Sequence, residues 1–205
     1  MFDSFKRATI SIVNLVNRVG TNSNRAVSVL ATQEAQLNFL AAAHRCANRD
    51  FVLGSLSEAS VLLNKSRFLT LARGVGLADG EKSNIVLFDL KNKNIINQGE
   101  GPQNLDLHRI AYTHSGFEAM LICHPKYAIH HFVENLALDF SLLPILESRI
   151  GPVAVCEVSD LANFVSDHTM IFVRDVGIIS LGETLDQSLE RVEFLEWICW
   201  QNQIN

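Results

Sequence analysis

The sequence predicts an α/β or α+β fold built around one large sheet, and three patterns support this prediction. The middle of the chain is rich in short β-type segments, helices and strands alternate in the second half, and the final segment has a strong helical repeat. Hydrophobic residues make up 48% of the 205 residues and charged residues 19%, with only 4 Pro and 11 Gly. This apolar content is enough for one well-buried core, so we expect one domain.

The first half is predicted to hold one helix followed by a meander of strands. The helix runs from Gln33 to Arg49, with Thr32 as its cap, and ends at the polar Asn48-Arg49-Asp50 break. Its predicted buried face consists of residues at helical spacing: Leu37, Leu40, Ala41 and His44. From Phe51 onward, strands are predicted at residues 60–63, 68–71, 84–90 and 95–96.

The second half is predicted to alternate between helices and strands. A helix over residues 105–115 ends at Gly116, and a buried strand over 119–123 precedes a helix that Pro125 begins. Strand segments at 152–158 and 170–173 flank a short helix from Asp160. The last helix has a capping box at residues 184–187 and one apolar face: Leu185, Leu189, Val192, Leu195 and Cys199.

Charge and composition exclude several classes of function. The formal net charge is −5 and there is no Lys/Arg cluster, which argues against a nucleic-acid partner. The four cysteines lie far apart in apolar settings, which is typical of reduced core thiols. The apolar stretch Ala8 to Val19 is interrupted by polar residues and falls short of the roughly 20 residues that cross a bilayer. We therefore expect a cytoplasmic protein without a membrane partner, and a surface helix at residues 8–19.

Three motifs in the second half carry a resemblance to a known family. The segment 101–109, GPQNLDLHR, resembles a Pro-Ser-Ser-Glu loop followed by a Leu-Pro-Leu-His helix start. The segment 122–128, ICHPKYA, resembles His-Thr-His-Pro-x-Tyr-Ala, and 174–185 resembles Arg-Asn-His-Gly followed by Gly-Glu-Thr-Leu. Weaker likenesses are Gly54–Ser57 to a Gly-Asn-Ile-Ser turn and Leu69–Gly74 to a Thr-Pro-Ser-Gly loop. Their order is similar to the class II aldolase/adducin family, which includes sugar-phosphate aldolases and epimerases.

The resemblance implies a three-layer α/β fold with a central, mostly antiparallel sheet flanked by helices. Residues 1–32 would be an N-terminal extension with a helix, and residues 33–205 the family domain. It also implies a homo-oligomer, often a tetramer, with active sites near subunit boundaries. A hetero-oligomer with an intact paralogue, whose site this chain completes, stays open as an alternative.

The residues that would hold the family's metal are replaced in this chain. A His-x-His pair on a strand can bind one ion, because residues two apart point to the same face. Here Ile122 and His124 occupy the pair, and Val176 occupies the position of a third imidazole. Isoleucine and valine offer no lone pair to a metal. Asn104 stands at the position of the acid/base glutamate and cannot exchange a proton near neutral pH.

The loops that would bind phosphate are also altered. Ser55 replaces an asparagine, while Pro102 and Gln103 replace two serines. The ligand-binding positions that the resemblance implies are therefore occupied by a mixed set: Gly54, Ser55, Ser57, Gly74 and Gln103. For Gly74, a turn requirement is an equally good explanation.

We interpret the chain as a non-catalytic family member, a pseudoenzyme that binds a ligand or acts as an oligomeric scaffold without a cofactor. The alternative is a divergent metal-dependent aldolase or epimerase acting on a sugar-phosphate-like or aldehyde substrate. That alternative requires zinc or another divalent metal at a rebuilt site, with His108 and Asp175 as substitute ligands beside His124.

Several other residues have a structural explanation. His124, as a lone histidine on an apolar strand, is predicted to be a hydrogen-bonded core or cleft residue. His130 and His131 should lie on the exposed and buried faces of one helix, because adjacent helical residues do not share a face. Trp197 and Trp200 are predicted to anchor the core or a subunit interface.

Overall fold

The structure is a computed structural model that describes residues 23–97 and 99–204. The chain divides into two compact units, residues 1–38 and 39–205, and each is described by itself. Helix α2 (Ser23–Ala47) begins in the first unit and ends in the second. The surface helix predicted at residues 8–19 lies outside the described residues.

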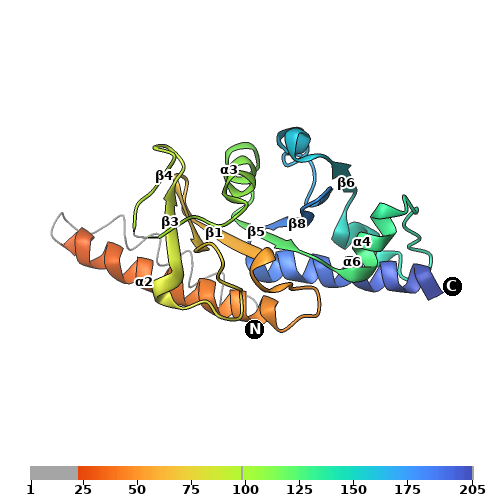
Figure 1. Ribbon diagram of the computed structural model, residues 1–205, viewed down its shortest axis with the longest axis horizontal. Coiled ribbons are helices and arrows are strands. Elements are labelled where there is room, and N and C mark those ends of the chain that lie inside the picture. Colours follow the sequence, from red (N-terminus) through yellow and green to blue (C-terminus); the bar gives the residue numbers. More distant parts are fainter. Residues whose placement is uncertain (1–22, 98, 205) are drawn as a thin grey trace. The chain divides into compact units, whose positions relative to one another are not determined.

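The second unit is built on one sheet of eight strands in the order β4-β3-β2-β1-β5-β8-β7-β6 (Figure 1). Six of its seven strand pairs are antiparallel, and only β6 and β7 are parallel. This confirms the predicted mostly antiparallel sheet. The strands are β1 (Glu58–Asn64), β2 (Arg67–Leu71), β3 (Ile85–Asp89), β4 (Asn94–Ile95), β5 (Ala119–Cys123), β6 (Val153–Cys156), β7 (Met170–Val173) and β8 (Gly177–Gly182).

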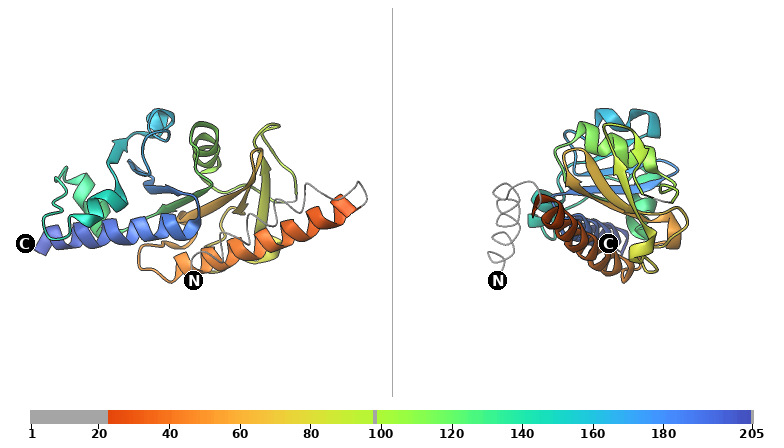
Figure 2. Two further views of the ribbon diagram at one scale, coloured as in Figure 1. Left: turned by 180° about the vertical axis from the view of Figure 1, so that it is seen from behind. Right: turned by 90° about the vertical axis from the view of Figure 1, so that its left-hand side faces the viewer.

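Helices cover both faces of this sheet. Figures 1 and 2 show α3 on one side of the strands and the long helix α6 on the other. The helices of the second unit are α3 (Leu105–His114), α4 (Lys126–Val133), α5 (Ile145–Ile150) and α6 (Leu185–Ile204), with 3₁₀ turns η1 (Gly54–Leu56), η2 (Lys82–Asn84) and η3 (Val158–Asn163). The predicted arrangement of a sheet between helices is confirmed.

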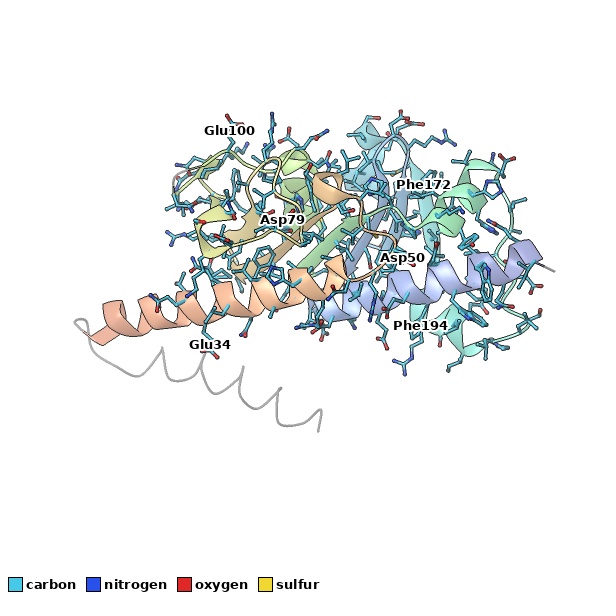
Figure 3. All side chains as sticks on the ribbon, turned by 60° about the horizontal axis from the view of Figure 1, so that its bottom comes forward. Glu34, Asp50, Asp79, Glu100, Phe172 and Phe194 are labelled. Atoms are coloured by element: carbon cyan, nitrogen blue, oxygen red, sulfur yellow. The ribbon has the colours of Figure 1, made fainter. Side chains whose placement is uncertain are left out.

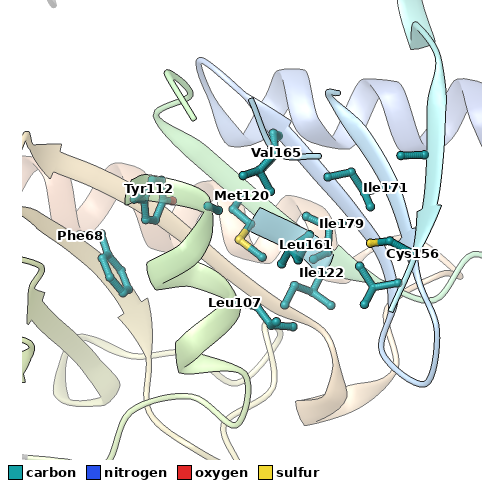
Figure 4. Close-up of a cluster of buried hydrophobic side chains, with 14 of the residues drawn as sticks. Phe68, Leu107, Tyr112, Met120, Ile122, Cys156, Leu161, Val165, Ile171 and Ile179 are labelled. Carbon is teal, nitrogen blue, oxygen red and sulfur yellow. The ribbon is translucent and has the colours of Figure 1, made fainter. Parts of the chain in front are cut away.

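The core on the α3 side is one cluster of buried apolar residues (Figure 4). It joins Leu107 of α3 and Leu161 of η3 to strand residues such as Ile122, Ile171 and Ile179. All four cysteines are buried and free, and burial raises the pKa of the Cys46 thiol to about 12. No helix in the described part of the chain is long and apolar enough to span a bilayer.

Two predictions about helices were wrong in detail. Helix α2 starts at Ser23, well before Gln33. Its buried residues are Phe39, Leu40, Ala42, Ala43 and Cys46, whereas Leu37, Ala41 and His44 are exposed. The apolar stripe was misplaced because Phe39 and Cys46, its bulkiest and last members, were not counted.

The last helix was predicted more accurately. All five residues of the predicted apolar face of α6 are buried. Thr184 Oγ1 accepts the Gln187 N–H at 3.1 Å, as a capping box requires. The Gln187 side chain, however, accepts the Glu183 N–H at 2.8 Å instead of the Thr184 N–H, so the second half of the box is shifted by one residue.

Strand β8 and helix α5 were not predicted from local patterns. All six residues of β8 are buried, because β5 and β7 flank it and helices cover both faces. A strand buried on both faces has no apolar/polar alternation to detect. The segment expected to be a short helix from Asp160 is the 3₁₀ turn η3.

Candidate functional site

The positions of the expected metal site come together where β1, β5, α3 and the β7–β8 turn meet. Glu58 of β1 pairs directly with Ile122 of β5. Asn104 precedes α3, and Val176 precedes β8. The tertiary structure therefore brings the sequence-predicted positions into one neighbourhood.

Two of the expected ligand positions belong to the hydrophobic core. Ile122 is 0% exposed and lies within the apolar cluster, where Figure 4 shows it near Leu107 and Leu161. Val176 is half-buried and packs against the same cluster. These side chains fill the space with carbon, so the residues present do not fit the metal that the fold family implies.

His124, the third position, lies against the Ser57 hydroxyl and the Val176 backbone. Ser57 Oγ accepts the Leu53 N–H at 2.9 Å and lies 3.2 Å from His124 Nδ1. The Val176 backbone also interacts with the imidazole. Burial lowers the pKa of His124 below its ordinary value, and the Val176 carbonyl only partly offsets this.

The backbone fixes His124 against the β7–β8 turn. Gly177 has a φ of +129°, and a Cβ there would lie 2.6 Å from the Cys123 carbonyl oxygen and 3.3 Å from His124 Nε2. Only glycine can occupy this position without displacing the strand or the imidazole.

Asn104, at the expected acid/base position, contributes its backbone rather than its side chain to the local structure. Its N–H donates to both carboxylate oxygens of Glu58, at 3.1 and 3.2 Å. Its carboxamide makes no capping hydrogen bond to α3, and the residue lines the cleft described below. The carboxylate that accepts a hydrogen bond from the backbone of position 104 is therefore that of Glu58.

Glu58 belongs to a buried polar network of four residues: Glu58, Ser60, His108 and Tyr112. His108 Nε2 donates to Glu58 Oε2 at 3.0 Å. Its Nδ1 lies 2.7 Å from Ser60 Oγ, which is in turn 2.7 Å from the Tyr112 hydroxyl. A hydroxyl can both donate and accept, so Ser60 can hydrogen-bond to His108 and to Tyr112 at the same time. Every polar group of the network therefore has a partner.

The network has the order carboxylate, imidazole, hydroxyl, but it is not arranged for nucleophilic catalysis. Ser60 and His108 are 0% exposed, so no substrate can approach the serine oxygen. His108, predicted as a substitute metal ligand, has both nitrogens engaged inside this network.

Glu58, Ser60 and Tyr112 were not predicted from the sequence as site residues. A usable signal existed, because Glu58 and Ser60 alternate on one face of a strand and interrupt an otherwise apolar pattern. Asp175, the other predicted substitute ligand, lies exposed in the turn after β7 with a φ of +62°.

A cleft of about 730 Å³ opens beside the start of α3. Asn104, Gln103 and Val176 line it, together with Arg73 and Glu100 from facing loops. Figure 3 shows Glu100 at the surface of the molecule. Arg73 was not predicted from the sequence as a site residue. Its side chain is exposed and forms no ion pair with any described residue.

The predicted ligand-binding residues lie in and beside this cleft. Gln103 lines the cleft itself, and Ser55, Ser57 and Gly74 line a small recess that Arg73 shares with it. Gly54 and Gly74 have φ values of +47° and +79°, which explains both glycines by backbone conformation alone. Among the described residues, no group of three or more His, Cys, Asp or Glu side chains is placed to hold a metal ion.

Residues 38–202 match the family of class II aldolase and adducin N-terminal domains, so the chain belongs to this family. No curated protein sequence matches it.

Solved structures share the fold at low sequence identity. YgbL from Klebsiella pneumoniae is 18% identical with a TM-score of 0.73, over 82% of this chain and 88% of that one. The L-fuculose-1-phosphate aldolase of Thermus thermophilus is 19% identical with a TM-score of 0.69, over 83% and 96%. The L-fuculose 1-phosphate aldolase of Glaciozyma antarctica is 17% identical with a TM-score of 0.71, over 94% and 80%.

Proposed function

We propose that this chain is a non-catalytic member of the class II aldolase family, which binds a small molecule in its cleft and serves in an oligomeric assembly. The parental reaction needs a metal to polarise a carbonyl and a carboxylate to move protons. This chain lacks the residues for the first at positions 122 and 176, and for the second at position 104.

The observation that carries this proposal is the packing of Ile122. Its side chain is fully buried among Leu107, Leu161 and their neighbours, so the substitution has become part of the core. A metal site in which only one ligand residue had been replaced would keep a polar pocket around the remaining ligand residues. Here the remaining histidine, His124, lies against the Ser57 hydroxyl and the Val176 backbone.

The cleft is the natural place for a ligand. Its volume of about 730 Å³ suits a small metabolite. Arg73 offers a guanidinium without an ion-pair partner among the described residues, and Asn104 offers a carboxamide that does not cap its helix. These groups favour an anionic ligand with a hydrogen-bonding group.

The test combines metal content with activity. The chain is purified without chelator or an affinity-tag metal, and zinc and manganese are measured per chain before and after titration. L-Fuculose 1-phosphate is then offered as substrate with and without EDTA. We expect well below one ion per chain and no cleavage that EDTA abolishes. About one tightly held ion with EDTA-sensitive cleavage would refute the proposal.

A divergent metal-dependent aldolase or epimerase is the second candidate, and Glu58 is the observation in its favour. This carboxylate lies opposite Ile122 in the sheet and beside Asn104, so it could serve as a substitute for the lost acid/base group. If L-fuculose 1-phosphate is converted, Glu58→Gln should abolish conversion while the protein stays folded. Unchanged conversion in Glu58→Gln would remove Glu58 from that role.

A further inference from the structure

The cleft beside α3 has an apolar part. Ile95 of β4, Leu105 and Leu107 of α3, Val158 of η3 and Val176 all line the cleft, and we name these residues the apolar wall. Leu107 belongs to the buried core cluster (Figure 4), and Ile95, Leu105 and Val176 pack against that cluster. The apolar wall is therefore an outward continuation of the core.

Val158 is the most open member of the apolar wall. It leaves 44% of its surface exposed, although it lines a cleft. It is the first residue of η3, and Leu161 of the same turn is fully buried in the core cluster, which fixes the turn against the domain. An apolar side chain that is open inside a cleft gains free energy when an apolar group of a ligand covers it.

The charged side chains around the cleft favour a ligand with a single negative charge. Among the described residues, those that line it are Arg73, Glu100 and Asp106. Arg109 offsets the charge of Asp106 through a contact of 2.7 Å. Arg73 and Glu100 have no ion-pair partner among the described residues. The cost of removing an ion from water rises steeply with its charge, and Glu100 weakens the attraction to Arg73, so a doubly charged phosphate is disfavoured.

The polar groups near Arg73 suit a carboxylate. The Arg73 N–H donates to the Glu100 carbonyl at 3.3 Å, which ties together the two loops at this part of the cleft. Gln103 and Asn104 also line the cleft, and the Asn104 carboxamide does not cap α3. A guanidinium and a carboxamide N–H together can donate to both oxygens of one carboxylate.

We infer that the ligand of this cleft is an apolar organic acid, a monocarboxylate with an aliphatic or aromatic tail. Its carboxylate binds to Arg73 and its tail covers the apolar wall. The inference rests on the proposed function, which assigns a small anionic ligand to the cleft, and it names the chemical class of that ligand. A sugar phosphate would place hydroxyl groups against carbon, where they lose their hydrogen bonds to water.

Isothermal titration calorimetry of the full chain with octanoate and phenylpropanoate tests the inference. We expect saturable binding of at least one of these two acids. Butyrate keeps the carboxylate but lacks most of the tail, and it should bind at least about tenfold more weakly. Octanol keeps the tail but lacks the charge, and it should also bind at least about tenfold more weakly than octanoate.

Two variants separate the carboxylate contact from the tail contact. With the tighter of the two acids, Arg73→Gln should weaken binding at least about tenfold, because a charge-assisted hydrogen bond is lost. Val158→Asp places a charge in the apolar wall and should weaken binding at least about tenfold. The matched controls are Arg149→Gln and Val133→Asp, which change exposed residues of α5 and α4 that do not line the cleft. Both controls should bind the acid as the wild type does.

A third variant tests the sign of the charge. Glu100→Gln removes a carboxylate that repels an anionic ligand, so it should tighten binding of the acid. Weaker binding in Glu100→Gln would contradict the position assigned to the ligand's carboxylate and would overturn the inference. Circular dichroism shows whether each variant is folded.

The absence of saturable binding for both acids would overturn the inference, as would unchanged binding in Arg73→Gln or in Val158→Asp. L-Fuculose 1-phosphate and inorganic phosphate are titrated in parallel. Tighter binding of the sugar phosphate than of both acids would overturn the inference, but without cleavage it would leave the proposed function intact. EDTA-sensitive cleavage of the sugar phosphate would refute the proposed function itself.

Discussion

Two regions on the same face of strands β1 and β5 differ in the kind of side chain that they bury. Ile122 and Val176 stand where the family resemblance predicts metal ligands; Ile122 is part of the apolar core and Val176 packs against it. On the neighbouring strand, Glu58 is paired with Ile122 and is the first residue of the buried polar network. Ser60, His108 and Tyr112 are all hydrogen-bonded in this network. The comparison teaches that burial tolerates either apolar side chains or polar groups that are fully paired.

Removing the carboxylate from the buried polar network should have the largest effect. Glu58→Ala leaves the His108 Nε2–H and the Asn104 N–H without their acceptor. We expect a loss of about 3–5 kcal/mol in the free energy of unfolding, because two buried donors lose their shared acceptor, each at a cost of about 1–3 kcal/mol. Urea denaturation monitored by circular dichroism measures it.

The control for this variant is Glu118→Ala, which removes an exposed carboxylate just before β5. Its unfolding free energy should change by less than about 0.5 kcal/mol. A change below about 1 kcal/mol for Glu58→Ala would mean that water replaces the carboxylate and that the network adds little to stability.

The second-largest loss of stability is expected in the apolar region, at Ile122. Ile122→Ala should lower the free energy of unfolding by about 2–5 kcal/mol, since the fully buried side chain leaves a cavity. Ile122→Val removes one methylene group and should lower it by about 0.5–1.5 kcal/mol. Equal stability of Ile122→Ala and wild type would show that position 122 is loosely packed, contrary to its place in the core.

A smaller effect is expected at the far end of the buried polar network. Tyr112→Phe keeps the ring that packs against Phe68 but removes the hydroxyl bonded to Ser60. The expected loss is about 1 kcal/mol, because one neutral hydrogen bond is lost. Chemical denaturation of the two proteins side by side gives the difference, and a gain in stability would contradict the assignment.

The smallest effect contrasts two buried histidines. His108 and His131 are both 0% exposed, but both ring nitrogens of His108 have hydrogen-bond partners, whereas among the described residues no group meets the ring nitrogens of His131 at hydrogen-bonding geometry. Burial lowers the pKa of His131, with partial compensation from the Leu136 backbone and a further small decrease from His130. The unfolded chain then binds more protons than the native state, so stability is present above the ordinary pKa of about 6.5 and is lost as the pH falls through the lowered native value.

Measuring the free energy of unfolding at pH 7.5 and 5.5 tests whether stability decreases as the pH falls. Wild type should be less stable at the lower pH, and His131→Leu should show a smaller decrease. The decrease should not vanish, because the pKa of His124 is lowered by burial as well. An identical decrease in both proteins would exclude His131 as its source.

The agreement between sequence and structure depends on the range of the interactions involved. The apolar face of α6 was predicted correctly, because a stripe at helical spacing reports directly on one buried side. His130 and His131 also divide between exposed and buried faces as predicted. Strand β8 escaped prediction because it is buried on both faces, and the buried face of α2 was misplaced because packing selected Phe39 and Cys46.

By itself, the sequence determined which side chains stand at the positions where the family resemblance predicts metal ligands and an acid/base group. Isoleucine and valine cannot bind a metal, and asparagine cannot exchange protons, whatever surrounds them. Only the tertiary structure decided which polar groups lie beside those positions. Glu58 and His108 are separated by 50 residues, and their contact exists because the strand pairing brings β1 beneath α3. Burial and hydrogen-bond partners depend on such long-range pairing, which a local pattern of residues cannot specify.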